Sequence, residues 1–170
     1  MNSVYVPRVG DHVIGVITNK NNDYYTVSIS NVFNGFLMCI DGFRGTTKKY
    51  KPNLTIGDVV FCYVYGMYDG LIELSCVTMD DNKNWSTNET YFGPLSNGFL
   101  TQLPLQHVQS LYNEELEVLR GLKYEIVLGF NGRVWIGNTS NELKLKISRF
   151  IKLSHNLNQQ QLKQLFKHIF

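Results

Sequence analysis

The sequence is poor in the features that mark disulfide scaffolds, zinc sites and membrane spans. Its 170 residues include only three cysteines, an odd number with no C-x-x-C pair, so neither a disulfide framework nor a zinc framework is indicated. The longest plainly apolar run, Val59 to Tyr65, is far shorter than the ~20 residues that a membrane helix needs. Because residues 1–10 also contain no basic segment followed by an apolar run, we expect a soluble, intracellular protein with no cofactor.

Motifs that support catalysis are missing as well. The sequence has no G-K-[ST] phosphate loop, no H-E-x-x-H and no G-x-S-x-G. The acidic pairs Asp80-Asp81 and Glu114-Glu115 are adjacent in sequence, and neighbouring side chains do not converge on one metal ion. The histidines are scattered without a metal-ligand spacing: His12, His107, His155 and His168. We therefore expect no catalytic residues, no metal and no small-molecule substrate, and a hydrolytic enzyme is the least favoured hypothesis.

What is present is a folded chain of moderate charge. Hydrophobic residues make up 44% of the sequence and charged residues 18%, a composition that excludes a disordered tail. The length leaves room for one ordinary domain or for two small ones of roughly 80 residues each. A net charge of +2 is too small to indicate a nucleic-acid-binding protein by itself, so a local basic cluster has to carry that argument.

The first half of the chain has the pattern of an all-β domain. Short strand-like segments separated by turn residues occur at 12–18, 24–30, 35–40, 59–65 and 71–75. In the second segment Tyr25, Val27 and Ile29 share one face, and polar residues share the other, as in a barrel wall with one wet side. Five strands with one long loop between the third and fourth predict an OB-type barrel, a fold widely used to bind single-stranded nucleic acid.

The second half predicts a separate α+β domain. We place the boundary near residue 80, which gives domains 1–79 and 80–170, and we expect residues 93–98 to form a loop. Apolar spacing predicts one helix from Pro104, a second through residues 116–122, and two more over 142–152 and 158–170. Strands are predicted at 124–128 and 133–137. The apolar stripe of the last helix packs on its own sheet or, alternatively, binds a partner.

Several motifs, in this order and spacing, carry a family resemblance. They are the Gly-Asp start at residues 9–15, the basic segment 44–49, Lys-Pro-Asn-Leu at 51–54, a second Gly-Asp at 56–58, and Gly-Phe-Asn-Gly-Arg-Val-Trp at 129–135. Together they make the chain similar to the S1/KH cap subunits of the RNA exosome, most closely to the branch called exosome component three. The resemblance implies a five-stranded S1-type OB barrel followed by an α+β KH-like domain.

The resemblance also implies a function. Cap subunits are non-catalytic RNA-binding members of a complex that degrades and processes RNA, including ribosomal RNA, from the 3′ end. They position RNA at the channel entrance and brace a ring of ribonuclease-PH-like subunits, in the nucleus, nucleolus and cytoplasm. Family members commonly begin with a further β-rich domain, which we expect this chain to lack, by nature or as a fragment. A free-standing S1/KH factor in translation or RNA processing is the alternative.

The residues offer two kinds of RNA-binding candidate. Four cations within eight residues could follow a phosphate backbone without reading bases: Arg44, Lys48, Lys49 and Lys51. The alternatives are that this loop needs charge for solubility or docks on an acidic neighbour. Tyr24, on the polar face of its strand, could stack on a base. Phe61, Tyr63 and Tyr65 could do the same, but both faces of their strand are apolar, which favours a wall covered by the second domain.

The turn Gly129-Phe130-Asn131-Gly132 resembles the Gly-x-x-Gly clamp with which KH domains hold RNA phosphates. Its flanking segments are strands, however, so Gly129 and Gly132 are expected to supply the positive φ of a hairpin turn. The helix junction at residues 111–115, where a clamp belongs, has no glycine and carries two carboxylates. We therefore predict a structural role, with Asn131 bonding neighbouring backbone and Trp135 packed between the domains.

Overall fold

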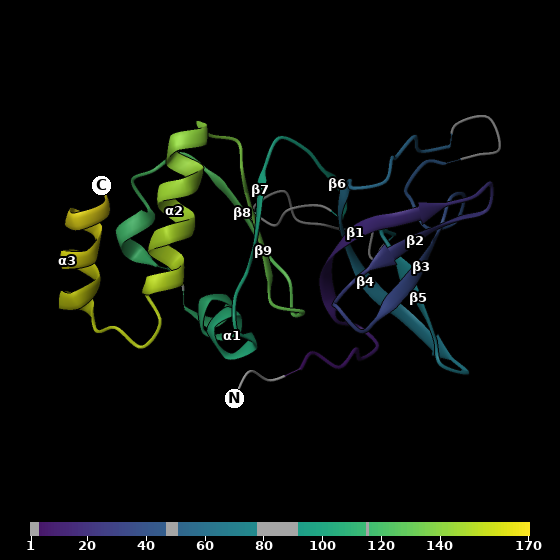
Figure 1. The fold of residues 1–170 in the computed structure, drawn as a ribbon, viewed down its shortest axis with the longest axis horizontal. Helices are drawn as coiled ribbons and strands as arrows, with labels where there is room; N and C mark the ends of the chain where they lie inside the picture. The colour runs from purple at the N-terminus through teal and green to yellow at the C-terminus, as the bar shows by residue number, and fades with distance from the viewer. Residues whose placement is uncertain (1–3, 47–50, 78–91, 115) are drawn as a thin grey trace. The chain divides into compact units, whose positions relative to one another are not determined.

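The structure, a computed structural model, describes residues 4–46, 51–77, 92–114 and 116–170. It divides into two compact units, which we describe separately (Figure 1). The barrel unit consists of Val4–Ser96 together with Gly129–Asn131, and the C-terminal unit of Asn97–Leu128 and Gly132–Phe170. The predicted domain boundary between residues 79 and 80 lies outside the described residues.

The barrel unit confirms the predicted five-stranded barrel. Its strands are β1 (His12–Lys20), β2 (Tyr24–Ser28), β3 (Asn34–Met38), β4 (Val59–Tyr68) and β5 (Leu71–Ser75). They follow the order β1-β2-β3-β5-β4, and pairing of β1 with β4 closes the barrel. All of these pairings are antiparallel except that between β3 and β5, which is parallel.

Alternation along the strands fills the barrel interior as predicted. On β2 and just beyond it Tyr25, Val27 and Ile29 are buried, and the residues between them are only half buried. The Tyr25 hydroxyl also holds the long loop before β4, because it donates to Pro52 O at 2.6 Å and accepts from Leu54 N at 3.2 Å. One interior side chain therefore fixes where the β3–β4 loop returns to the barrel.

Part of the predicted loop 93–98 is a strand instead. β6 (Gly93–Leu95) pairs antiparallel with the first residues of β4 and forms the edge of the six-stranded order. Pro94 has no N–H to donate, and proline is tolerated in a sheet mainly at such an edge. The turn-forming residues hid this strand, since Gly93 and Pro94 make up two of its three positions.

The C-terminal unit is the predicted helix-and-strand domain. Its antiparallel sheet has the order β7-β9-β8, formed by β7 (Phe99–Gln102), β8 (Glu125–Leu128) and β9 (Arg133–Gly137). The α-helices are α1 (Leu105–Asn113), α2 (Asn141–Leu153) and α3 (Gln159–Ile169). Helix α2 lies between the sheet and α3 (Figure 1). Its buried residues Ile147, Phe150 and Ile151 form one core with residues of β9.

Local signals explain where α2 and α3 begin. The Ser140 side chain accepts a hydrogen bond from Leu143 N at 3.2 Å, and Asn158 forms a capping box with Gln161. Such caps satisfy N–H groups that a helix leaves without an internal partner. Of the described residues, no helix is long and apolar enough to cross a membrane.

The predicted second helix over residues 116–122 is wrong. The segment contains only a three-residue 3-10 turn, η1 (Glu117–Leu119), whose residue before the first turn, Leu116, makes no side-chain cap. Only six residues run from Leu116 to Gly121, and so short a segment without a cap does not offset the free-energy cost of forming the first helical turn. The leucines of this segment pack individually: Leu119 is buried in the core, and Leu116 and Leu122 pack against the core while partly buried.

Candidate nucleic-acid interface

The predicted basic loop is described only at its two ends. Arg44 and Lys51 are exposed, and Lys48 and Lys49 lie outside the described residues. Thr46 holds the first end, because its hydroxyl donates to the carbonyls of Ile40 and Phe43. The loop therefore presents at least two cations to solvent from fixed anchor points.

Lys20, which the sequence reasoning missed, lies at the same end of the barrel as Lys51. The Lys20 Nζ lies 3.4 Å from Leu54 O, and the Lys51 Nζ lies 3.2 Å from Asn22 O. The contact between the β1–β2 turn and the end of the β3–β4 loop thus places at one end of the barrel two cations that are 31 positions apart in the sequence. No sequence signal marks Lys20, which simply ends a strand.

Asp23 and Cys39 lie near Lys51, and the charges of Lys51 and Asp23 both act on the Cys39 thiol. Burial raises the pKa of the Cys39 thiol, the Lys51 ammonium opposes that rise, and the Asp23 carboxylate adds to it. A phosphate near Lys51 would therefore also experience the negative charge of Asp23.

Tyr24 begins β2, directly after this turn, and is half buried. Its ring meets that of Phe36 on β3 edge-on, with centroids 5.0 Å apart and planes at 84°. The turn itself is shaped by Asn21, whose Oδ1 accepts from the backbone N–H of Asp23 at 2.8 Å and of Tyr24 at 2.9 Å. Tyr24 thus places an aromatic ring on strands 2 and 3, the region through which OB folds bind oligonucleotides.

The aromatic residues of β4 differ among themselves. Phe61 is buried, with its ring centroid 4.8 Å from that of Phe92, and Tyr63 is half buried 5.2 Å from the same ring. Tyr65 is 44% exposed. The cover that the structure describes over Phe61 and Tyr63 comes from their own unit, and Tyr65 is the most exposed of the three.

The glycine turn was interpreted only partly correctly. Gly132 has the expected positive φ, +86°, but Gly129 does not adopt one. Gly129 is needed for space instead, since a Cβ there would overlap Asn131 Oδ1 and lie 3.0 Å from Ile14 N. Gly132 lacks space as well, since a Cβ there would overlap Leu103 O, so the positive φ is what distinguishes Gly132 from Gly129.

Asn131 makes three buried hydrogen bonds to the barrel strands. Its Oδ1 accepts from Ile14 N at 3.2 Å, and its Nδ2 donates to Ile14 O at 2.8 Å and to Ile29 O at 2.7 Å. The side chain is 2% exposed. The bonded backbone is more than 100 positions away in sequence, and not the turn's own. The Asn131 amide thus bonds Ile14 of β1 through both its N–H and its C=O, as the backbone of a neighbouring strand would. Ile14 lies before the first residue of β1 that pairs with β2.

Trp135 is 4% exposed on β9. A Cβ on Gly98 or Gly137 would overlap its ring, so these two glycines provide the space in which the indole lies within the C-terminal unit. Its predicted packing between domains stays a prediction.

Comparison with known proteins agrees with this architecture. Residues 5–86 match the family described as "Exosome complex component RRP40, S1 domain", and residues 98–142 match a KH domain. Exosome complex component RRP40 of Homo sapiens is 28% identical over 170 residues, which are 97% of this chain and 60% of the relative. Residues 5–86 are therefore an S1 domain of the RRP40 family.

Two further relatives are similar to most of this chain. The Saccharomyces cerevisiae RRP40 is 30% identical across 78% of this chain and 55% of its own length. Exosome complex component Rrp4 of Pyrococcus furiosus is 27% identical across 88% of this chain and 57% of its own length. The chain thus spans a little over half the length of these relatives.

One solved structure, described as an exosome complex RNA-binding protein, shares the fold. Its TM-score is 0.73 at 18% identity, with 98% of this chain and 95% of that chain covered. At that identity the likeness concerns the fold. Within the described ranges, no group of three histidine, cysteine, aspartate or glutamate side chains is arranged to hold a metal ion.

Proposed function

We propose that the chain is a non-catalytic RNA-binding cap subunit of the exosome. In this role it positions RNA at the channel entrance and braces a ring of ribonuclease-PH-like subunits, in the nucleus, nucleolus and cytoplasm. The observation that carries the proposal is the RRP40-type S1 barrel, with Lys20 and Lys51 at one end of the barrel and Tyr24 on the neighbouring strand β2. The names of the relatives support the assembly to which we assign it.

The geometry suits RNA of any sequence. The two ammonium groups hydrogen-bond backbone carbonyls of Leu54 and Asn22, and lysines of this kind can neutralise phosphates. An aromatic ring at the start of β2 adds stacking, which every base can satisfy. Contacts of these two kinds hold and orient a strand without selecting its sequence, as a subunit that passes many RNAs requires.

The assembly is tested by purifying the tagged full chain from its own cells at moderate salt and identifying its partners by mass spectrometry. We expect ribonuclease-PH-like subunits in near-equal amounts. Recovery of the chain without such subunits, but with bound RNA, would contradict the cap assignment and favour a free-standing RNA-binding factor. Cleavage of labelled RNA by the pure chain would contradict the non-catalytic role.

A further inference from the structure

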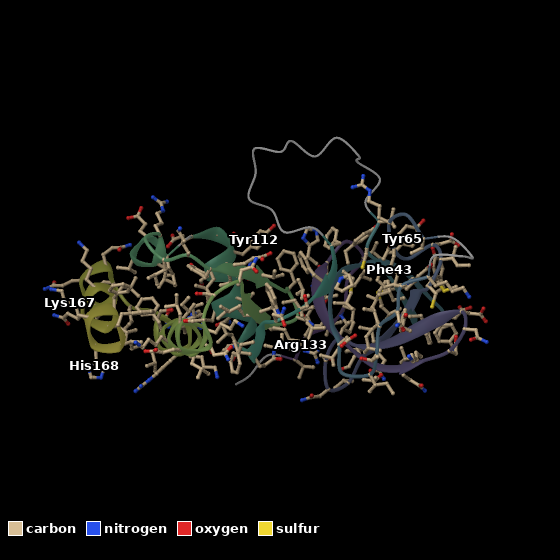
Figure 2. The ribbon with its side chains drawn as sticks, turned by 90° about the horizontal axis from the view of Figure 1, so that it is seen from above. Phe43, Tyr65, Tyr112, Arg133, Lys167 and His168 are labelled. Atoms are coloured by element: carbon tan, nitrogen blue, oxygen red, sulfur yellow. The ribbon has the colours of Figure 1, made fainter. Side chains whose placement is uncertain are left out.

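A second candidate site lies on the outer surface of the barrel unit. A surface cavity of about 350 Å³ is lined by residues of β3, β4, β5 and the turn after β3, including Met38, Asp41, Tyr63, Tyr65 and Glu73. We call it the acidic aromatic pocket. Figure 2 labels Tyr65, whose side chain lies at the surface of the barrel unit.

The strand register explains why these side chains meet. Tyr63 pairs with Ser75, and Gly66 pairs with Glu73, with a register shift between Val64 and Gly66. Tyr65 is therefore the extra residue of a bulge, and bulges redirect the side chain that they carry. Because of the bulge, Tyr65 lines the same pocket as Glu73 of the neighbouring strand β5.

A tight turn holds the acidic rim. Gly42 donates its N–H to Met38 O at 3.1 Å and accepts from Cys76 N at 2.7 Å. A Cβ on Gly42 would overlap Met38 O, so only glycine allows this close return after β3. Asp41 precedes Gly42 and is exposed at the mouth of the pocket.

The pocket combines negative charge with aromatic rings. Within the described parts of the chain, neither Asp41 nor Glu73 forms an ion pair or side-chain hydrogen bond with another residue, and the described residues that line the pocket include no cation. The rings of Tyr63 and Tyr65 have centroids 6.4 Å apart and planes at 63°. The Tyr63 hydroxyl donates to Val77 O, which fixes that ring.

Such a lining repels phosphate and attracts a cation. A guanidinium satisfies both features at once, because its planar fork bonds carboxylates and its face stacks on aromatic rings. A lysine ammonium would gain less from the rings, since it is compact and strongly hydrated. We propose that the acidic aromatic pocket receives an arginine side chain from a basic segment of a partner protein. Met38 of this pocket pairs with Tyr24 in the β2–β3 register, so the pocket adjoins that RNA-binding candidate, but the arginine proposal does not depend on the proposed function.

The proposal is tested by NMR on the full chain with ¹³C-methyl-labelled methionine, which places a reporter at Met38. The probe is a short Gly-Ser peptide with one central arginine, and its control carries citrulline, which has the same shape without the charge. We expect saturable shifts of the Met38 methyl signal with the arginine peptide only. Equal shifts with both peptides, or none with either, would overturn the proposal.

Variants identify the contacts. Glu73→Gln should weaken binding of the arginine peptide about tenfold, the effect of losing one charge-assisted hydrogen bond. Asp69→Asn is the matched control, because Asp69 is an exposed carboxylate of the same unit outside the pocket lining, at a φ of 50° that asparagine tolerates. Equal affinities of the two variants would count against the site. Oligo-uridine is added as a competitor. If it displaces the peptide and itself shifts the Met38 methyl signal, the pocket binds RNA and the arginine proposal is overturned.

Discussion

Asn131→Ala should destabilise the barrel unit strongly. The substitution removes three hydrogen bonds and leaves Ile14 N, Ile14 O and Ile29 O without that partner in a buried place. Each buried backbone group left unsatisfied costs about 1–3 kcal/mol, so a loss of about 3 kcal/mol or more is expected. Domains of this size are stable by only about 5–15 kcal/mol, so the change is a large share of the total.

The measurement is urea unfolding followed by circular dichroism. Asn53→Ala is the control, since Asn53 is an exposed asparagine of the same unit. Asn131→Asp should also unfold early, because a carboxylate cannot donate to Ile14 O and Ile29 O. If Asn131→Ala unfolds at the same urea concentration as Asn53→Ala, the three bonds do not hold the barrel and the reasoning is refuted.

Three further predictions concern the other sites. Trp135→Ala should lower the free energy of unfolding by about 3–5 kcal/mol in a melting experiment, because it empties a buried ring site, and unchanged melting would contradict this. Lys20→Glu with Lys51→Glu should reduce the salt slope of single-stranded RNA binding by about 1.4, at about 0.7 per phosphate contact, while the exposed Lys163→Glu leaves it unchanged. His107 is 2% exposed, and burial lowers the pKa of its imidazole. The free energy of unfolding should therefore be highest above pH 6.5, the ordinary pKa of histidine, and should decrease as the pH falls below that value. His107→Gln should flatten that decline between pH 7 and pH 5, and an unchanged melting curve would count against it.

Much of the fold could be predicted because it depends on local periodicity. The alternation of Tyr25, Val27 and Ile29 has the two-residue period of a strand, and the capped segments of α2 and α3 have the spacing of helices. The strand β6 was missed because turn residues form it. The helix through residues 116–122 was wrongly predicted because leucine spacing indicates burial without supplying length or a cap.

The candidate sites were harder to predict because they depend on contacts between distant segments. Lys20 and Lys51 come to the same end of the barrel only when the β3–β4 loop packs against the β1–β2 turn, and Asn131 bonds strands more than 100 positions away. Gly129 and Gly132 look alike in sequence, and only the structure shows that both lack space for a Cβ while Gly132 alone also has a positive φ. Sequence patterns identify residues of the right chemistry and do not show which of them share a surface.

The most direct test of the central claim is ultraviolet cross-linking of the purified assembly to single-stranded RNA, followed by mass spectrometry of the adducts. We predict nucleotide adducts on Tyr24 or on peptides that contain Lys20 or Lys51. Adducts confined to the C-terminal unit, with none on these barrel residues, would contradict the proposed RNA-binding surface.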